Sequence, residues 1–108
     1  MVCGGVVLAV EAQEGTDAML GRIVELPVSL RGSATERQGV LAKMLKPNQD
    51  SRVDLPTIGL TTIQLAARAG LAGIVLEAGR AFVLDREAVT QAADAAGIFV
   101  AGIPPAGP

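Results

Sequence analysis

The chain contains 108 residues, of which 50% are hydrophobic, and its formal net charge is −2. Phe82 and Phe99 are its only aromatic residues, so it lacks the aromatic platforms on which single-stranded nucleic acid stacks. With 9 basic and 11 acidic residues it also lacks the basic excess of a duplex-binding protein, and no nucleic-acid partner is expected. The absence of histidine excludes a histidine-based hydrolase triad and a histidine-ligated zinc site within the chain.

The cysteine content and the hydrophobic runs bear on the cellular compartment. Cys3 is the only cysteine, so no disulfide can form within the chain, which favours a reducing environment. Residues 1–10 are too short and wrongly flanked for a signal peptide. No run of about 18 uncharged apolar residues is present, so no membrane span is expected. These features predict a cytoplasmic protein.

The N-terminal part of the sequence predicts a hairpin followed by a helix. Gly4 and Gly5 are typical of a hairpin turn, and residues 6–10 form an apolar run suited to a buried strand. Thr16 is suited to cap a helix, and Pro27 to end or bend it. The apolar stripe of this helix consists of Met19, Leu20, Ile23, Val24 and Leu26.

Strands and helices alternate through the rest of the sequence. Thr61 and Gln64 predict a capping box at the start of the second helix. Together the elements predict an α/β fold, with about five strands in a mixed sheet and three helices packed on it in a single compact domain. The remaining predicted elements are a polar loop at 30–38, strands at 39–45, 73–77, 81–84 and 98–103, a cap at Asp85, and helix ends at Gly70 and Gly97.

Charged residues gather in the loop that follows the second predicted strand. Arg52 offers a planar group that fits a phosphate, while Lys43 and Lys46 supply compact positive charges. Asp50 and Asp54 provide carboxylate oxygens of the kind that Mg²⁺ shares with substrate phosphates. The loop therefore predicts a site for a phosphate-containing substrate, and a solvated loop whose charges pair with each other is the alternative.

A second group of polar residues surrounds the start of the first helix. A helix N-terminus presents free backbone N–H groups that can bind an anion, and Gly15 would allow a close approach to them. Glu11 follows a predicted strand, which is a common position for catalytic groups in α/β sheets. Helix capping by Thr16 and Asp17 is the alternative explanation, although it leaves Glu11 unexplained.

Both groups of residues resemble segments of the LpxI family, the UDP-2,3-diacylglucosamine pyrophosphatases of lipid A biosynthesis. The resemblance rests on residues 8–20 and 46–59 and continues through 67–74 and 77–80. It covers nearly the whole chain in the right order, and it implies that residues 1–103 form the C-terminal (catalytic) domain of this family. Residues 104–108 would then be a proline-rich tail, and the N-terminal domain of the family is absent from this chain.

The resemblance implies Mg²⁺-dependent hydrolysis of UDP-2,3-diacylglucosamine to UMP and 2,3-diacylglucosamine 1-phosphate (lipid X). It also implies that the active site lies where the C-terminal domain meets the missing N-terminal domain. Together with the chemistry of the residues, the resemblance predicts two sets of groups. One set holds a metal ion or orients water, and the other neutralises the diphosphate. The predicted catalytic residues are Asp50 and Asp54, the metal ligands Asp50, Asp54 and Glu11, and the phosphate-binding residues Lys43, Lys46, Arg52, Gly15 and Thr16.

Two other functions remain open from the sequence. The chain could bind a nucleotide or an acyl-sugar phosphate without turnover, or it could act as an oligomerisation unit. The Gly- and Ala-rich segment 91–97 would suit close packing in a homodimer. A lipid substrate also leaves open a peripheral contact with the inner membrane, although the sequence contains no basic amphipathic helix to argue for one.

Overall fold

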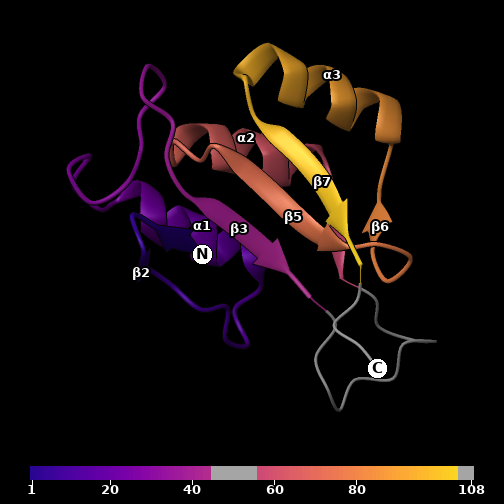
Figure 1. The fold of residues 1–108 in the computed structure, drawn as a ribbon, viewed down its shortest axis with the longest axis horizontal. Coiled ribbons are helices and arrows are strands. Elements are labelled where there is room, and N and C mark those ends of the chain that lie inside the picture. Colours follow the sequence, from indigo (N-terminus) through magenta and orange to yellow (C-terminus); the bar gives the residue numbers. More distant parts are fainter. Residues whose placement is uncertain (45–55, 105–108) are drawn as a thin grey trace.

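Three helices and seven strands make up the part of the chain, residues 1–44 and 56–104, that this computed structural model describes (Figure 1). The helices are α1 (Thr16–Val24), α2 (Leu60–Arg68) and α3 (Arg86–Ala96). The strands are β1 (Val2–Cys3), β2 (Val6–Val7), β3 (Val40–Lys43), β4 (Thr57–Ile58), β5 (Gly73–Glu77), β6 (Phe82–Val83) and β7 (Phe99–Ile103). This arrangement confirms the predicted α/β fold with three helices and a mixed sheet.

The main sheet contains five strands in the order β2-β1-β3-β5-β7. Strands β3, β5 and β7 run parallel, and their arrowheads point the same way in Figure 1. Strand β1 pairs antiparallel with both β2 and β3, while β4 and β6 form a separate parallel pair. The three parallel strands therefore present their carboxyl ends along one edge, which is where α/β proteins usually bind ligands.

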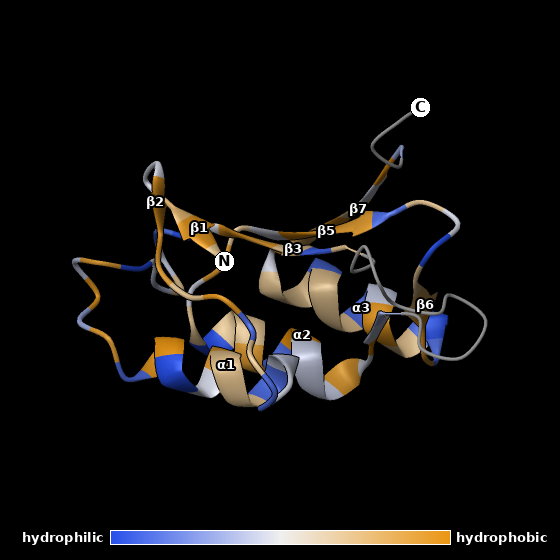
Figure 2. Cartoon of the chain, turned by 90° about the horizontal axis from the view of Figure 1, so that it is seen from below, coloured by the Kyte–Doolittle hydropathy of each residue, from blue (hydrophilic) through white to orange (hydrophobic). Residues whose placement is uncertain are grey.

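The two faces of the main sheet have different surroundings. Figure 2 shows that α1, α2 and α3 all lie on the same side of it. Leu41 and Ile74, paired on neighbouring strands, point toward these helices and are buried. The opposite face is also apolar, and its Val2 and Phe99 are 43% and 49% exposed. The core of the described chain therefore lies between the sheet and the helices.

The predicted buried strand at 6–10 is wrong in both length and burial. Strand β2 contains only Val6 and Val7, and both are exposed because β2 is the outermost strand of the sheet. The chain then turns back, and the N-terminal ammonium of Met1 donates to the carbonyl of Ala9 at 2.7 Å. Burial lowers the pKa of this ammonium below its ordinary value. The predicted hairpin turn at Gly4 and Gly5 is confirmed.

The two predicted helix starts differ from the observed ones. Gly15, not Thr16, occupies the N-cap position of α1, because the Thr16 hydroxyl bonds to a side chain outside the helix. Helix α2 begins at Leu60 after Gly59, and the predicted pair of Thr61 and Gln64 is wrong. The hydroxyl of Thr62 instead accepts from the Gly59 N–H at 3.2 Å, which allows the helix to begin earlier.

The predicted ends of the helices agree with the structure. Gly70 and Gly97 both have left-handed backbone conformations; Gly97 directly follows α3, and Gly70 follows Ala69, the C-cap residue of α2. Asp85 caps α3 by accepting from the N–H of Ala88 at 3.4 Å. Arg37, whose role the sequence did not indicate, donates to carbonyls at the C-terminal ends of α2 and α3. Because α1, α2 and α3 each return from the end of a strand, their N-termini lie toward the carboxyl edge of the sheet.

Two further predictions concern the C-terminal tail and membrane spans. The assignment of residues 104–108 to a tail falls mostly on residues 105–108, which lie outside the described ranges. Within residues 1–44 and 56–104, no helix combines the length and the apolar character needed to cross a bilayer.

Candidate functional site

A hollow of about 580 Å³ lies at the carboxyl end of β3, between the first turns of α1 and α2. The N-terminal ends of two helices therefore face the same space, and each brings backbone N–H groups that lack partners within its helix. The residues around the hollow are Glu11, Glu14, Gly15, Thr16, Asp17, Ala18, Lys43, Thr57, Ile58, Gly59, Leu60, Thr61, Thr62, Leu84 and Asp85.

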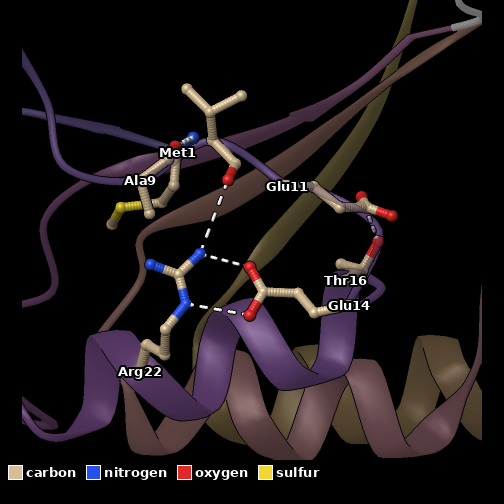
Figure 3. A network of polar contacts seen from close by, with 7 residues as sticks. Met1, Ala9, Glu11, Glu14, Thr16 and Arg22 are labelled. Carbon is tan, nitrogen blue, oxygen red and sulfur yellow. Dashed lines mark hydrogen bonds and ion pairs between the residues drawn. The ribbon is translucent and has the colours of Figure 1, made fainter.

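Among the described residues that line the hollow, Lys43 is the only one with a positively charged side chain. It is the last residue of β3, and its side chain is only 13% exposed. Its ammonium donates to the hydroxyl of Thr16 and lies 3.3 Å from Oε2 of Glu11. The Thr16 hydroxyl in turn donates to the same Glu11 oxygen at 2.6 Å (Figure 3). Three residues predicted to belong to the site thus form one connected group, which we call the Lys43 cluster.

The Lys43 cluster explains why Thr16 does not cap α1. Its hydroxyl is held by Glu11 and Lys43, and Gly15 at the N-cap position has no side chain to accept from the helix. Gly15 also has a φ of 91°, a conformation that favours glycine. The first turn of α1 therefore has no side-chain cap. The predicted binding of phosphate by the backbone of Gly15 and Thr16 requires such an uncapped turn.

Glu14, in the loop before α1, has a structural partner on that helix. Both oxygens of its carboxylate pair with the guanidinium of Arg22 in a two-pronged arrangement (Figure 3). Arg22 also donates to the carbonyl of Val10 at 3.5 Å. This contact fastens the loop before α1 to the body of the helix, and so it holds the loop that carries Glu11.

Thr62 connects the two helices that border the hollow. Its hydroxyl donates to Oδ1 of Asp17 at 3.2 Å and accepts from the Gly59 N–H. Because Asp17 belongs to the first turn of α1, this bond fixes the spacing of the two helix N-termini. Thr62 is not among the residues predicted for the site, although a threonine three residues after Gly59 and before an apolar helix pattern was an available signal.

The other predicted site residues lie outside the described part of the chain. Lys46, Asp50, Arg52 and Asp54 all fall within residues 45–55. The described residues on either side of this segment include Lys43 and Thr57, and both of them line the hollow.

The described residues can be tested for their fit to a metal ion. In residues 1–44 and 56–104, no group of three or more His, Cys, Asp or Glu side chains is close enough to form a metal site. Mg²⁺ usually needs only one or two carboxylates, with water and substrate phosphates completing its coordination. Glu11 and Asp17 place carboxylates of this kind at the hollow, although Glu11 already pairs with Lys43. The donors fit Mg²⁺, and the predicted role of Glu11 as a ligand stays a prediction.

Comparison with known proteins identifies similar sequences. The sequence model of the LpxI C-terminal domain family matches residues 1–101. Over 105 residues, the chain is 67% identical to a Caulobacter vibrioides protein named UDP-2,3-diacylglucosamine pyrophosphatase LpxI. The matched region covers 97% of this chain and 38% of that relative, so the chain spans well under half of the relative's length.

Proposed function

Because the chain belongs to the LpxI C-terminal domain family, we propose that it contributes the phosphate-binding part of a UDP-2,3-diacylglucosamine pyrophosphatase. In this reaction, water attacks one phosphorus of the diphosphate and the bridging P–O bond breaks. The products are UMP and 2,3-diacylglucosamine 1-phosphate (lipid X), and the attacking water loses its proton. The residues that perform these steps would lie at the hollow and in the segment 45–55.

The observation that carries this proposal is the Lys43 cluster at the carboxyl edge of the sheet. A lysine that is 13% exposed would not be expected inside a strand without a partner, and Glu11 and Thr16 hold it toward the hollow. A diphosphate in the hollow would meet this ammonium and the uncapped first turn of α1. Both groups are positive, and both are fixed in place before a substrate arrives. Groups that are ordered in advance in this way stabilise the charge of a transition state most effectively.

The proposed division of labour extends to the residues of the segment 45–55. Lys46 and Arg52 would neutralise further phosphate oxygens, while Asp50 and Asp54 would hold Mg²⁺ or orient the water. Mg²⁺, when bound, would polarise the phosphoryl oxygens and lower the pKa of a water molecule. Lys43 would remain on the diphosphate throughout, and Thr16 would hold it there through the bond to its ammonium.

A second candidate function is binding of the nucleotide or the acyl-sugar phosphate without turnover. The observation that favours it is the length of the relative, because the chain spans only 38% of it. The hollow would bind phosphate in the same way, and the groups that complete catalysis would come from the remainder of the longer protein. The cytoplasmic location, the homodimer and the membrane contact stay predictions.

Replacing Asp50 with asparagine tests the proposed chemistry. We suggest a chimera in which this chain replaces the matched region of the Caulobacter relative. The neutral amide would be a poor metal ligand and a poor base, so UMP release should fall by about 100-fold or more. Glu36→Gln, an equivalent change in an exposed loop, should leave UMP release unaltered. An Asp50→Asn chimera that releases UMP at the parental rate would remove Asp50 from the mechanism.

A further inference from the structure

A second hollow, which we call the α3–β7 groove, lies along β7, the outermost strand of the sheet on the side away from β2. Its volume is about 540 Å³, and it is bordered by α3 and by the face of β7 that points toward the helices. Its base consists of apolar residues that are almost completely buried. These residues are Leu76, Val89, Ala93 and Ile98.

The exposure of Val100 shows that the groove is a gap in the packing of the core. Val100 pairs with Ile74, which pairs with Leu41, so all three side chains point to the same face of the sheet. Leu41 and Ile74 are 2% and 0% exposed, whereas Val100 is 36% exposed. Two small residues line the groove together with Val100, namely Ala93 of α3 and Gly102 of β7. Within residues 1–44 and 56–104, an apolar side chain on the core face is therefore only partly covered.

The charged residues that line the groove do not occupy its base. Glu77 is buried and lies 3.7 Å from the guanidinium of Arg80, so an opposite charge is close to its carboxylate. Arg86 and Asp94 belong to the exposed positions of α3. The groove thus combines an apolar base with a charged rim, which suits an apolar ligand that carries a polar group at one end.

The groove adjoins the hollow that contains the Lys43 cluster. Four consecutive residues, 83–86, separate the two, and they connect β6 to α3. Leu84 and Asp85 line the hollow, while Val83 and Arg86 line the groove. A single ligand with a phosphate and an apolar chain could therefore place one part on each side of this connection.

We propose that the α3–β7 groove binds an acyl chain of the substrate while the diphosphate occupies the hollow. This inference rests on the proposed function, because the relative's name specifies a diacylated sugar nucleotide. An acyl chain is flexible and apolar, so a half-open groove lined by small side chains accommodates it and removes its surface from water. The groove then selects the acylated compound over the bare sugar phosphate.

The test measures binding to the 108-residue chain by titration calorimetry. The ligands are UMP, glucosamine 1-phosphate and its 2,3-diacyl derivative, with acyl chains short enough to remain below the aggregation concentration. The chain should bind the diacyl compound at least about tenfold more tightly than the bare sugar phosphate. Val100→Trp fills the groove with an indole ring and should abolish this preference while UMP binding is retained.

Two further variants make the result specific to the groove. Val7→Trp is the same change on the other outermost strand, at an exposed residue, and should retain both affinities. Gly102→Leu also fills the groove, and a Cβ at this position makes only an ordinary contact of 3.5 Å with Ala78, so it replaces Val100→Trp if that variant does not fold.

The possible results separate this inference from the proposed function. UMP binding with no preference for the diacyl compound, or an unchanged preference after the groove is filled, would overturn the acyl site and leave the phosphate site intact. A chain that binds none of the three ligands would contradict both. Loss of the preference in the groove variants alone would support the assignment.

Discussion

Replacing Lys43 with methionine should lower kcat/KM for UDP-2,3-diacylglucosamine by about 100- to 1,000-fold in the chimera with the Caulobacter relative. Methionine keeps most of the length and apolar character of the lysine side chain but removes its charge. The ammonium is already fixed by Thr16 and Glu11, so it stabilises the diphosphate without having to be ordered first. The hollow would then contain the Glu11 carboxylate without its cation, and this charge would repel a phosphate.

Two other variants establish whether the effect arises at the hollow. Arg68→Met also removes a positive charge, but Arg68 is exposed in the last turn of α2, at the end of the helix away from the hollow. This control should retain parental kcat/KM. Lys43→Arg keeps the charge with a different shape, so it should recover only part of the activity. Equal losses in Lys43→Met and Arg68→Met would show that net charge, rather than the Lys43 cluster, determines the rate.

Replacing Gly70 with alanine should destabilise the chain by about 4 kcal/mol or prevent folding. Gly70 has a φ of 75°, and an alanine Cβ would lie 2.0 Å from the carbonyl oxygen of Gly32. The three nearest atoms, the carbonyl oxygen and carbon of Gly32 and the nitrogen of Ser33, all belong to the backbone, so no side chain can move aside. The loop that precedes β3 would have to separate from the end of α2. Urea unfolding of the 108-residue chain would measure the change.

Gly79→Ala provides a matched control for the backbone conformation. Gly79 has a φ of 76°, but among the described residues other than its two chain neighbours no atom lies within 4 Å of the Cβ that alanine would add. The substitution should therefore cost only the strain of the left-handed conformation, about 1 to 2 kcal/mol. Equal costs for the two variants would contradict the close contact between Gly32 and Gly70 as the reason for the larger effect.

Two predicted strands agree closely with the structure: β5 in the middle of the sheet, and β7 at its edge, where 98–103 was predicted and Phe99–Ile103 is observed. The segment 73–77 was predicted with its observed limits, because β5 lies between β3 and β7 and is a continuous apolar run before Glu77. Residues 6–10 carry an equally apolar pattern, yet β2 lies at the edge of the sheet and ends at Val7. An apolar run does not indicate how many strands flank it, so burial at the edge could not be predicted from the sequence.

The helix starts show how tertiary contacts alter a local pattern. A threonine before an apolar stripe is a common N-cap, and nothing near Thr16 in the sequence reveals that Lys43 will reach it. The Thr16 hydroxyl accepts from the Lys43 ammonium and donates to the Glu11 carboxylate, and Gly15 occupies the N-cap position instead. The contacts that prevent Thr16 from capping α1 also bring together three of the residues predicted for the site.

The rest of the hollow could not be identified from the sequence because its residues have ordinary local explanations. Thr57 belongs to a short strand, and Asp85 is a helix cap. Only the pairing of β4 with β6 brings these two elements to the hollow. A pairing between such short strands leaves almost no signal in the amino-acid pattern. By contrast, the position of a charged residue within or after an apolar run was the signal that led to the prediction of Lys43 and Glu11, and both line the hollow.

Release of UMP from UDP-2,3-diacylglucosamine by the chimera is the most direct test of the proposed function. The comparison is with the Caulobacter relative from which the matched region has been deleted, each with Mg²⁺ and with a chelator. We expect the chimera to release UMP only when Mg²⁺ is present, and the deleted protein to release none. A folded chimera that binds UMP but does not cleave the substrate would contradict a catalytic role for this chain.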